Sequence, residues 1–290
     1  MKKFSRERGL STIFLVLLLI LTCGVFMILK IENDNISRKK FPGSSVIFIP
    51  SGKYLKFATL GYSSLLADLV YLWAIQYYSN YSIPERFDYL DHIFSIIAEL
   101  DPCYLDPYDI GALIAVYDAR DLDIALKILD RGLDKNPDQW IFPYNAGHYV
   151  QMLKKDHILA QEYYKKMMEI EGAPVIARRL YANAAFKSMD YQTALENWQE
   201  IYQTAKEEKD ERIKKIASNH IYQVKAAIDI QMVKGAIAKF KERYGRNPID
   251  LSRLVKAGFL DSLPKDLDGK EYLYDSKTGE VKAPTIPWKR

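Results

Sequence analysis

The feature that most constrains this chain is a self-similarity with a period of 34 or 35 residues through its middle. Four segments align in one register: RFDYLDHIFSIIAELDP, DLDIALKILDRGLDKNP, DHILAQEYYKKMMEIEG and DYQTALENWQEIYQTAK. Their small or aliphatic positions, spaced 35, 35 and 34 residues apart, are Leu90, Ala125, Ala160 and Ala194. The large side chains four residues later are Phe94, Leu129, Tyr164 and Trp198. A period of this length is typical of solenoids built from stacked helix pairs.

Helix packing explains why a small residue is followed by a large one a turn later. The small side chain lets two antiparallel helices approach closely, and the large one fills the gap to the next pair. The prolines of Asp101-Pro102 and Asn136-Pro137 are expected to stop the first two helices. Further helices, such as FPYNAGHYVQMLKK and PVIARRLYANAAFKS, lie between the aligned segments and are expected to pair with them.

These features resemble the tetratricopeptide repeat (TPR), a helix–turn–helix unit of 34 residues. The resemblance covers roughly residues 70–205, and its best match is Ala146-Gly147 followed by Ala160, Tyr164 and Met167. It implies a groove, lined by the first helix of each pair, that holds a peptide or a helix of a partner protein.

The groove-facing residues follow from counting along the repeat. They are expected to be Tyr117, Asn145, Tyr149, Arg179, Asn183 and Lys187. Arg179 with Asn183 partly resembles the carboxylate clamp of chaperone-binding members, in which basic and amide side chains grip a chain terminus. The remaining basic residues of that clamp are missing here, so a polar and aromatic groove is the expectation.

The N-terminus carries an apolar stretch, residues 10–29, without a charged side chain. Such a helix spans about 30 Å, the thickness of the hydrocarbon core of a bilayer. Lys2, Lys3, Arg6 and Arg8 precede it. Because short basic flanks stay on the cytoplasmic side, we expect a single-pass anchor in a bacterial inner membrane. The N-terminus would be cytoplasmic and the remainder of the chain periplasmic.

Two processing alternatives bear on this stretch. Cys23 lies in ILTCG, which resembles a lipoprotein box, but Thr22 and the apolar sequence that follows favour an ordinary cysteine. RERGLSTIFLVLLLI resembles a type IV prepilin leader, in which cleavage would follow Gly9. Those families usually carry a glutamate five residues after the glycine, where this chain has Phe14. An uncleaved anchor with a basic flank is the favoured interpretation.

The stretch before the first repeat, LGYSSLLADLVYLWAIQYYSNYS, is apolar nearly all round and holds one acid, Asp68. The favoured interpretation is a buried first helix that covers the end of the solenoid, with Asp68 hydrogen-bonded or capping a neighbour. The alternative is a surface that docks on the membrane or on a membrane partner. Its interface residues would be Tyr71, Trp73, Tyr77 and Tyr78.

Helical periodicity continues after the last repeat, up to about Tyr244. We expect a long capping helix that ends at Gly245, since Pro248 cannot continue it. A short helix near Leu251 and a β-hairpin, residues 271–275 and 280–282, are expected to follow.

This C-terminal part resembles that of type II secretion major pseudopilins, where a helix leads through YGxxP and LP-x-D to a small hairpin. The calcium-binding loop that those pseudopilins carry further on is missing. Asp266-Leu-Asp268-Gly269 resembles only the start of such a loop, and a turn formed by Asp and Gly explains it. We expect no metal and no cofactor.

Composition and motifs favour binding over catalysis. The sequence holds no Gly-rich phosphate loop, HExxH, paired CxxC or Gly-x-Ser-x-Gly. Its two cysteines and four histidines are scattered, which disfavours a zinc site. The net charge of +4 arises in residues 1–30, which carry five bases and one acid, so the rest of the chain is neutral. A nucleic-acid surface is therefore not expected, and neither is a small-molecule site.

Together these features predict an all-α chain with a small C-terminal hairpin. Its expected parts are a basic stub and transmembrane anchor (1–30), a linker (31–59), TPR-like repeats (60–208), a long capping helix (209–246) and a pseudopilin-like module (247–290). The expected function is a membrane-anchored scaffold that binds protein partners in the cell envelope, for secretion or pilus-type machinery. The alternative is a processed, prepilin-like structural subunit that carries a TPR domain.

Overall fold

The computed structural model describes residues 2–35, 49–83 and 85–289, with the side chains of the first helix described from residue 16 to residue 32. The fold is mostly helical and has a two-stranded antiparallel hairpin near the C-terminus, as predicted. The chain divides into two compact units, Met1–Ile49 with Ser82–Pro84 and Pro50–Tyr81 with Glu85–Arg290.

The first unit contains one long helix, α1 (Lys2–Asn35). Its described side chains, residues 16–32, are exposed, and most of them are apolar. Within the described residues, no helix combines the length and the apolarity that crossing a bilayer requires. The side chains of residues 1–15, which include part of the predicted anchor and the prepilin-like positions Gly9 and Phe14, lie outside the described residues.

Parts of the predicted linker, residues 31–59, are helical. Helix α1 runs on to Asn35, and α2 (Gly52–Ala58) forms within the predicted linker, whose residues 36–48 lie outside the described ones. Helix α2 packs on α4 because Gly52 has no side chain, and a Cβ there would lie 2.5 Å from the Ile96 carbonyl oxygen. The Lys53 amide donates to Oε2 of Glu99 at 2.6 Å. Seven residues are too few for a periodic pattern to reveal such a helix.

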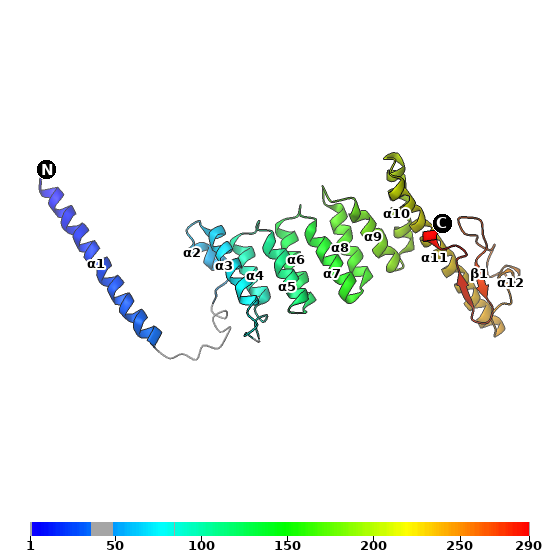
Figure 1. The fold of residues 1–290 in the computed structure, drawn as a ribbon, viewed down its shortest axis with the longest axis horizontal. Coiled ribbons are helices and arrows are strands. Elements are labelled where there is room, and N and C mark those ends of the chain that lie inside the picture. The colour runs from blue at the N-terminus through cyan, green and yellow to red at the C-terminus, as the bar shows by residue number, and fades with distance from the viewer. Residues whose placement is uncertain (1, 36–48, 84, 290) are drawn as a thin grey trace. The chain divides into compact units, whose positions relative to one another are not determined.

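The second unit is a row of helices in which each packs against the next along the chain (Figure 1). Their bounds are α3 (Ser63–Tyr78), α4 (Leu90–Leu100), α5 (Asp106–Tyr117), α6 (Leu122–Lys135), α7 (Ile141–Tyr149), α8 (His157–Glu169), α9 (Ile176–Lys187), α10 (Tyr191–Glu207) and α11 (Glu211–Tyr244). A π-helical turn, η2 (Val150–Lys154), extends α7. This arrangement is compatible with the predicted α-solenoid.

The aligned repeat positions form the core of these helices. All eight are at most 2% exposed: Leu90, Ala125, Ala160, Ala194, Phe94, Leu129, Tyr164 and Trp198. Two glycines leave room for the large rings to pack against the neighbouring helix. A Cβ on Gly111 would lie 2.8 Å from the Phe94 ring, and a Cβ on Gly147 would lie 2.8 Å from the Tyr164 ring. The predicted burial of small and large residues at this spacing is confirmed.

A common turn joins helices within the row. Aspartates accept hydrogen bonds from the amide three residues later and so cap α6, α8, α10 and α11; they are Asp121, Asp156, Asp190 and Asp210. The residue before each one has a left-handed backbone, with φ between 55° and 66°: Arg120, Lys155, Met189 and Lys209. The chain therefore reverses in a short, fixed turn at each of these places.

Helix α3 is buried on one face only, which corrects the expectation of a buried first helix. Ala67 and Ala74 pack inward, whereas Leu65, Leu69, Leu72 and Asp68 are exposed. By contrast, the four aromatic residues proposed as a membrane-docking surface are not exposed. Tyr77 and Tyr78 are buried, and Tyr71 and Trp73 are partly buried. The physical reason is that α3 packs on α4 along one face, so that its leucines face away from that helix.

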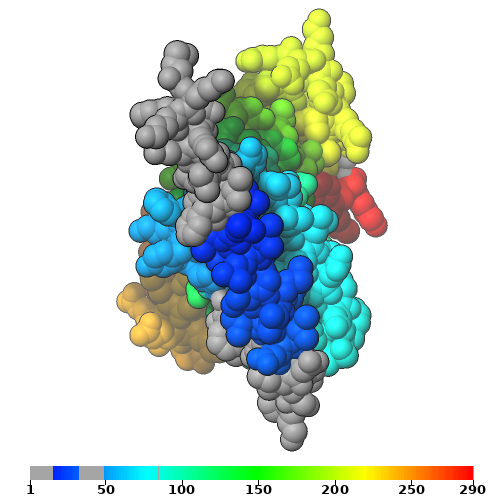
Figure 2. Space-filling view, turned by 90° about the vertical axis from the view of Figure 1, so that its left-hand side faces the viewer, coloured from blue at the N-terminus to red at the C-terminus, as the bar shows by residue number. Residues whose placement is uncertain are grey.

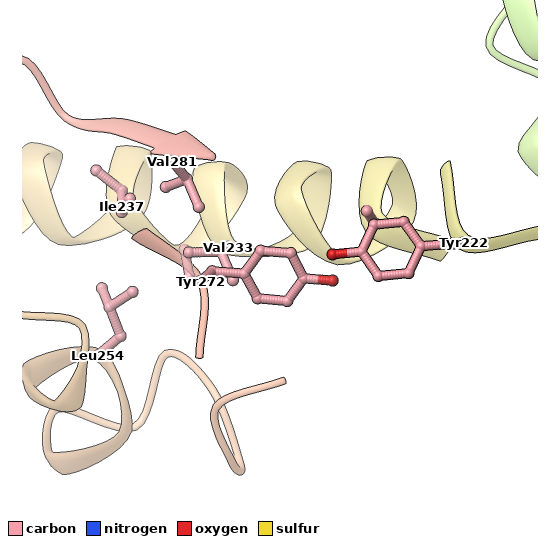
Figure 3. Close-up of a cluster of buried hydrophobic side chains, with 8 residues drawn as sticks. Tyr222, Val233, Ile237, Leu254, Tyr272 and Val281 are labelled. Carbon is pink, nitrogen blue, oxygen red and sulfur yellow. The ribbon is translucent and has the colours of Figure 1, made fainter. Parts of the chain in front are cut away.

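The C-terminal module folds onto α11, which ends at Gly245 with φ of 71°, as predicted. It consists of α12 (Ser252–Lys256), the strands β1 (Leu273–Asp275) and β2 (Glu280–Lys282), and a final turn, η3 (Pro287–Lys289). In the hairpin, Tyr274 lies opposite Val281. The side chains of Val233 and Ile237 on α11 meet Leu254, Tyr272 and Val281 in one apolar cluster (Figure 3).

Two buried tyrosine–aspartate hydrogen bonds join the module to α11. Tyr222 of α11 donates to Asp266 of the module at 2.8 Å, and Tyr272 of the module donates to Asp229 of α11 at 2.8 Å. The two hydroxyl groups point toward one another in Figure 3. Burial opposes the ionisation of Asp266, but the Lys270 amide and the Tyr222 hydroxyl outweigh it and lower its pKa. The amides of Asp268 and Lys270 both donate to Oδ1 of Asp266, so its carboxylate accepts hydrogen bonds from this short segment.

Replacement of Tyr272 by Phe is expected to lower the free energy of unfolding by about 2 kcal/mol. The hydroxyl that donates to Oδ2 of the buried Asp229 is lost, while the ion pair of Asp229 with Lys225, at 3.3 Å, remains. Urea unfolding measures the change. Tyr244→Phe is the control, since its side chain is half exposed, and equal effects of the two variants would contradict the account.

Candidate protein-binding surface

Three of the six predicted groove residues come together where α5 and α7 lie close to one another. Tyr117, at the end of α5, is exposed, and its ring meets the ring of Tyr149 edge to face at 6.2 Å. On α7, Nδ2 of Asn145 donates to Oδ1 of Asp109 at 3.0 Å. The result is a small cluster of aromatic and polar groups that spans two neighbouring repeats.

Asp109 belongs to this cluster although the sequence analysis missed it. It lies 36 residues before Asn145, about one repeat, and this spacing is the signal that could have revealed it. Burial raises the pKa of Asp109, and the hydrogen bond from Asn145 partly offsets that rise. Burial also raises the pKa of Tyr149, and Tyr117 and Asp109 add to the effect. The cluster is thus a partly desolvated acceptor beside two phenol rings, which can accept hydrogen bonds from a peptide.

The Asn145→Ala variant is expected to raise the pKa of Asp109 further. The substitution removes the hydrogen bond that stabilises the ionised carboxylate and leaves the desolvation by burial in place. Carbon-13 NMR titration of the aspartate carboxyl groups measures this pKa. An unchanged or lower value would contradict the inferred hydrogen bond, and Lys165→Ala on α8 is the neutral control.

Apolar side chains flank the cluster at the end of α5 and in η2. Leu113, Tyr117, Met152 and Leu153 are all exposed. A cavity of about 400 Å³ lies among Val116, Tyr117, Arg120, Leu122, Leu153 and Lys154. The surface therefore offers an apolar hollow with two basic residues, Arg120 and Lys154, at its margin, and Lys154 forms an ion pair with Asp123 at 2.8 Å.

The other three predicted residues form a separate group on α9. Arg179 and Asn183 are partly buried, and Lys187 is exposed. Nε of Arg179 is buried and has no hydrogen-bond partner in the part of the chain that the structure describes. The neighbouring Arg178 forms an ion pair with Glu200, and both arginines line a cavity of about 520 Å³. The structure thus places the predicted residues in two groups, not in one clamp.

His220 on α11 lies near this second group. Its ring stacks on Trp198 at 3.9 Å and meets the Trp288 ring edge-on at 4.8 Å. Burial lowers the pKa of His220; a hydrogen bond with Gln223 opposes the shift, and the charge of Arg179 adds to it. The folded chain therefore favours the neutral imidazole.

The free energy of unfolding is expected to fall as the pH drops through 6.5, the ordinary pKa of histidine. Below that value the unfolded chain binds a proton that the folded chain resists, because the folded pKa is lower. His220→Phe keeps a stacked ring without the titration, so it should lose less stability between about pH 8 and about pH 5.5. Urea unfolding at both values measures the difference. Equal losses in the two proteins would contradict the role of His220.

Within the described ranges, no group of three or more His, Cys, Asp or Glu side chains could hold a metal ion. No family model matches this chain, and no curated protein matches its sequence at a significant level.

Proposed function

We propose that the protein is a membrane-anchored, TPR-like scaffold whose α5–α7–α9 surface binds a peptide segment of a partner protein in the cell envelope. The observation that carries the proposal is the cluster of Asp109, Asn145, Tyr117 and Tyr149. The polar groups of this cluster can bind backbone amides of a peptide, and the exposed apolar side chains beside it can bind apolar side chains of the same peptide.

The helical row supports the TPR-like part of the proposal. The equivalent residues Asp109, Asn145 and Arg179 recur at intervals of 36 and 34 residues on α5, α7 and α9. A repeat places equivalent side chains along one surface, so that an extended ligand can contact each helix in turn. Arg179, whose Nε has no partner in the described part of the chain, is suited to a carboxylate or a carbonyl group of the ligand.

Two observations support the anchor. Residues 10–29 hold no charge, and the described side chains of α1 from Val16 to Ile31 are exposed apolar groups, apart from Lys30 and a few small or polar ones. Exposed aliphatic side chains over several turns are costly in water and favourable in lipid. The basic N-terminal flank supports a cytoplasmic N-terminus and a periplasmic body. The pseudopilin-like C-terminal segment is the reason to propose secretion or pilus-type machinery.

Native mass spectrometry of the full chain, extracted in mild detergent, tests the scaffold. We expect a stoichiometric protein partner, lost in the double variant Asn145→Ala/Arg179→Ala and retained in Lys165→Ala, whose side chain lies on α8. Retention of the partner in the double variant would contradict binding at this surface. The intact mass tests the alternative function, because a mature chain beginning at Leu10 would indicate a processed, prepilin-like subunit.

A further inference from the structure

The N-terminal end of the helical row exposes an unusual concentration of large apolar side chains. Phe57 is 90% exposed and Leu60 is 89% exposed, and Tyr54 and Tyr62 beside them are 73% exposed. In Figure 2 the light-blue atoms of α2 lie at the surface of this end. Exposed leucines on α3 (Leu65, Leu69 and Leu72) continue the apolar surface one helical turn at a time.

The backbone presents Leu60 in a conformation that a large residue seldom adopts. Its φ is 51°, in the left-handed region, and Gly61 follows with φ of 101°. The same left-handed backbone occurs in the turns of the helical row at Arg120, Lys155, Met189 and Lys209, so at Leu60 it marks a tight turn. Here it holds a leucine at the tip of a turn in almost full contact with solvent. At 89% exposure, the Leu60 side chain is not part of the core.

Basic groups lie directly beside the tip. Lys53 and Lys56 of α2 line a cavity of about 480 Å³ together with Phe57 and Lys135. Glu99 also lines it, and its carboxylate accepts the Lys53 amide, so the three ammonium groups outnumber the single acid. A hollow with this charge is complementary to a phosphate, and apolar side chains beside it are complementary to acyl chains. Anionic lipid presents both in one surface.

The chain itself holds this surface near the bilayer. In the sequence, Gly52, the first residue of α2, follows Asn35, the last residue of α1, after only 16 intervening residues. This step rests on the anchor of the proposed function. A surface tethered to an anchor by so few residues meets the bilayer at a high effective concentration, so a few apolar and basic side chains suffice for binding.

We propose that the tip formed by Phe57, Leu60 and Tyr62 inserts into the interface of an anionic bilayer, with Lys53 and Lys56 bound to lipid phosphates. The leucine stripe of α3 extends the contact. Docking at this end orients the helical row on the membrane, in addition to the tether that α1 supplies.

Spin labelling of the full chain in vesicles tests this proposal. The vesicles are phosphatidylcholine with about one third phosphatidylglycerol, and the background is Cys23→Ala/Cys103→Ala. Leu60→Cys carries the label, and Met189→Cys is the matched control. Met189 is also a large apolar residue with positive φ, 66°, in an exposed turn. We expect the label at 60 to collide more with oxygen than with a water-soluble nickel complex, and the label at 189 to show the reverse.

Charge reversal sharpens the test. In the variant Lys53→Glu/Lys56→Glu, and in vesicles of phosphatidylcholine alone, the label at 60 should collide less with oxygen and more with the nickel complex. A label at 60 that is as accessible to nickel as the label at 189 would overturn the proposal. Protection from both reagents with dipolar broadening would overturn it too, since it would place a second copy on the tip.

A third label separates this inference from the proposed anchor. Leu21→Cys reports on α1, where the native side chain is exposed. Lipid exposure at 21 with water exposure at 60 would overturn the docking surface alone. Water exposure at both positions would overturn the anchor and the docking surface together.

Discussion

Replacement of Trp198 by Ala is expected to lower the free energy of unfolding by about 3–5 kcal/mol, the largest effect among the substitutions considered. Trp198 is 2% exposed and lies in an apolar cluster with Ala182 and Ala185 of α9 and Ala217 and Val224 of α11. Its removal leaves a cavity among three helices that are packed through small residues. Those small side chains cannot expand to fill the space.

Urea unfolding measures the loss, and Trp288→Ala is its matched control. Trp288 has the same ring and also contacts His220, but it is 55% exposed. Its truncation should cost about 1 kcal/mol or less, since little surface returns to water. If the two variants lost equal stability, burial of Trp198 between α9 and α11 would be wrong.

Replacement of Gly147 by Val is expected to cost about 3 kcal/mol. A Cβ on Gly147 would lie 2.8 Å from Cε1 of Tyr164, a buried ring that has no room to withdraw. The same substitution at Gly235 in α11 is the control, because nothing lies within 4 Å of a Cβ there. Since Val and Gly differ by only a few tenths of a kcal/mol in a helix, Gly235→Val should change stability by about 0.5 kcal/mol or less.

A second substitution identifies the cause. Tyr164→Leu removes the ring that crowds position 147, so the double variant Gly147→Val/Tyr164→Leu should be more stable than the sum of the single effects predicts. Thermal and urea unfolding of the four proteins give the coupling energy. Strict additivity would contradict a direct contact between α7 and α8 at this position.

The helical row could be predicted because packing imposes its period on the sequence. Ala125, Ala160 and Ala194 recur at a fixed spacing since helices approach closely at those positions, and the structure buries all three. The end of the long helix was equally readable, because Gly245 adopts the left-handed conformation that a C-cap requires. Three of the four capping aspartates, which were not predicted as caps, are the first residues of aligned segments: Asp121, Asp156 and Asp190.

The exposed surfaces were harder to predict, because the composition of a helix does not indicate which of its faces a neighbouring helix buries. Helix α3 is apolar enough to suggest burial, but its leucines are left uncovered by α4. Likewise, Asp109 gave no signal by itself, since its role depends on Asn145 in the next repeat. The division of the predicted groove residues into two groups depends on contacts between α5 and α7 that residue spacing does not encode.

Site-specific photo-crosslinking in native membranes tests the central claim, that the α5–α7–α9 surface binds a peptide segment of a partner. A benzophenone side chain replaces Tyr117 or Lys187, which are exposed on α5 and α9, and Lys165 on α8 is the control. The account predicts adducts from positions 117 and 187 that map to one segment of one protein, and none from position 165. Adducts of equal yield from all three positions, or from position 165 alone, would contradict it.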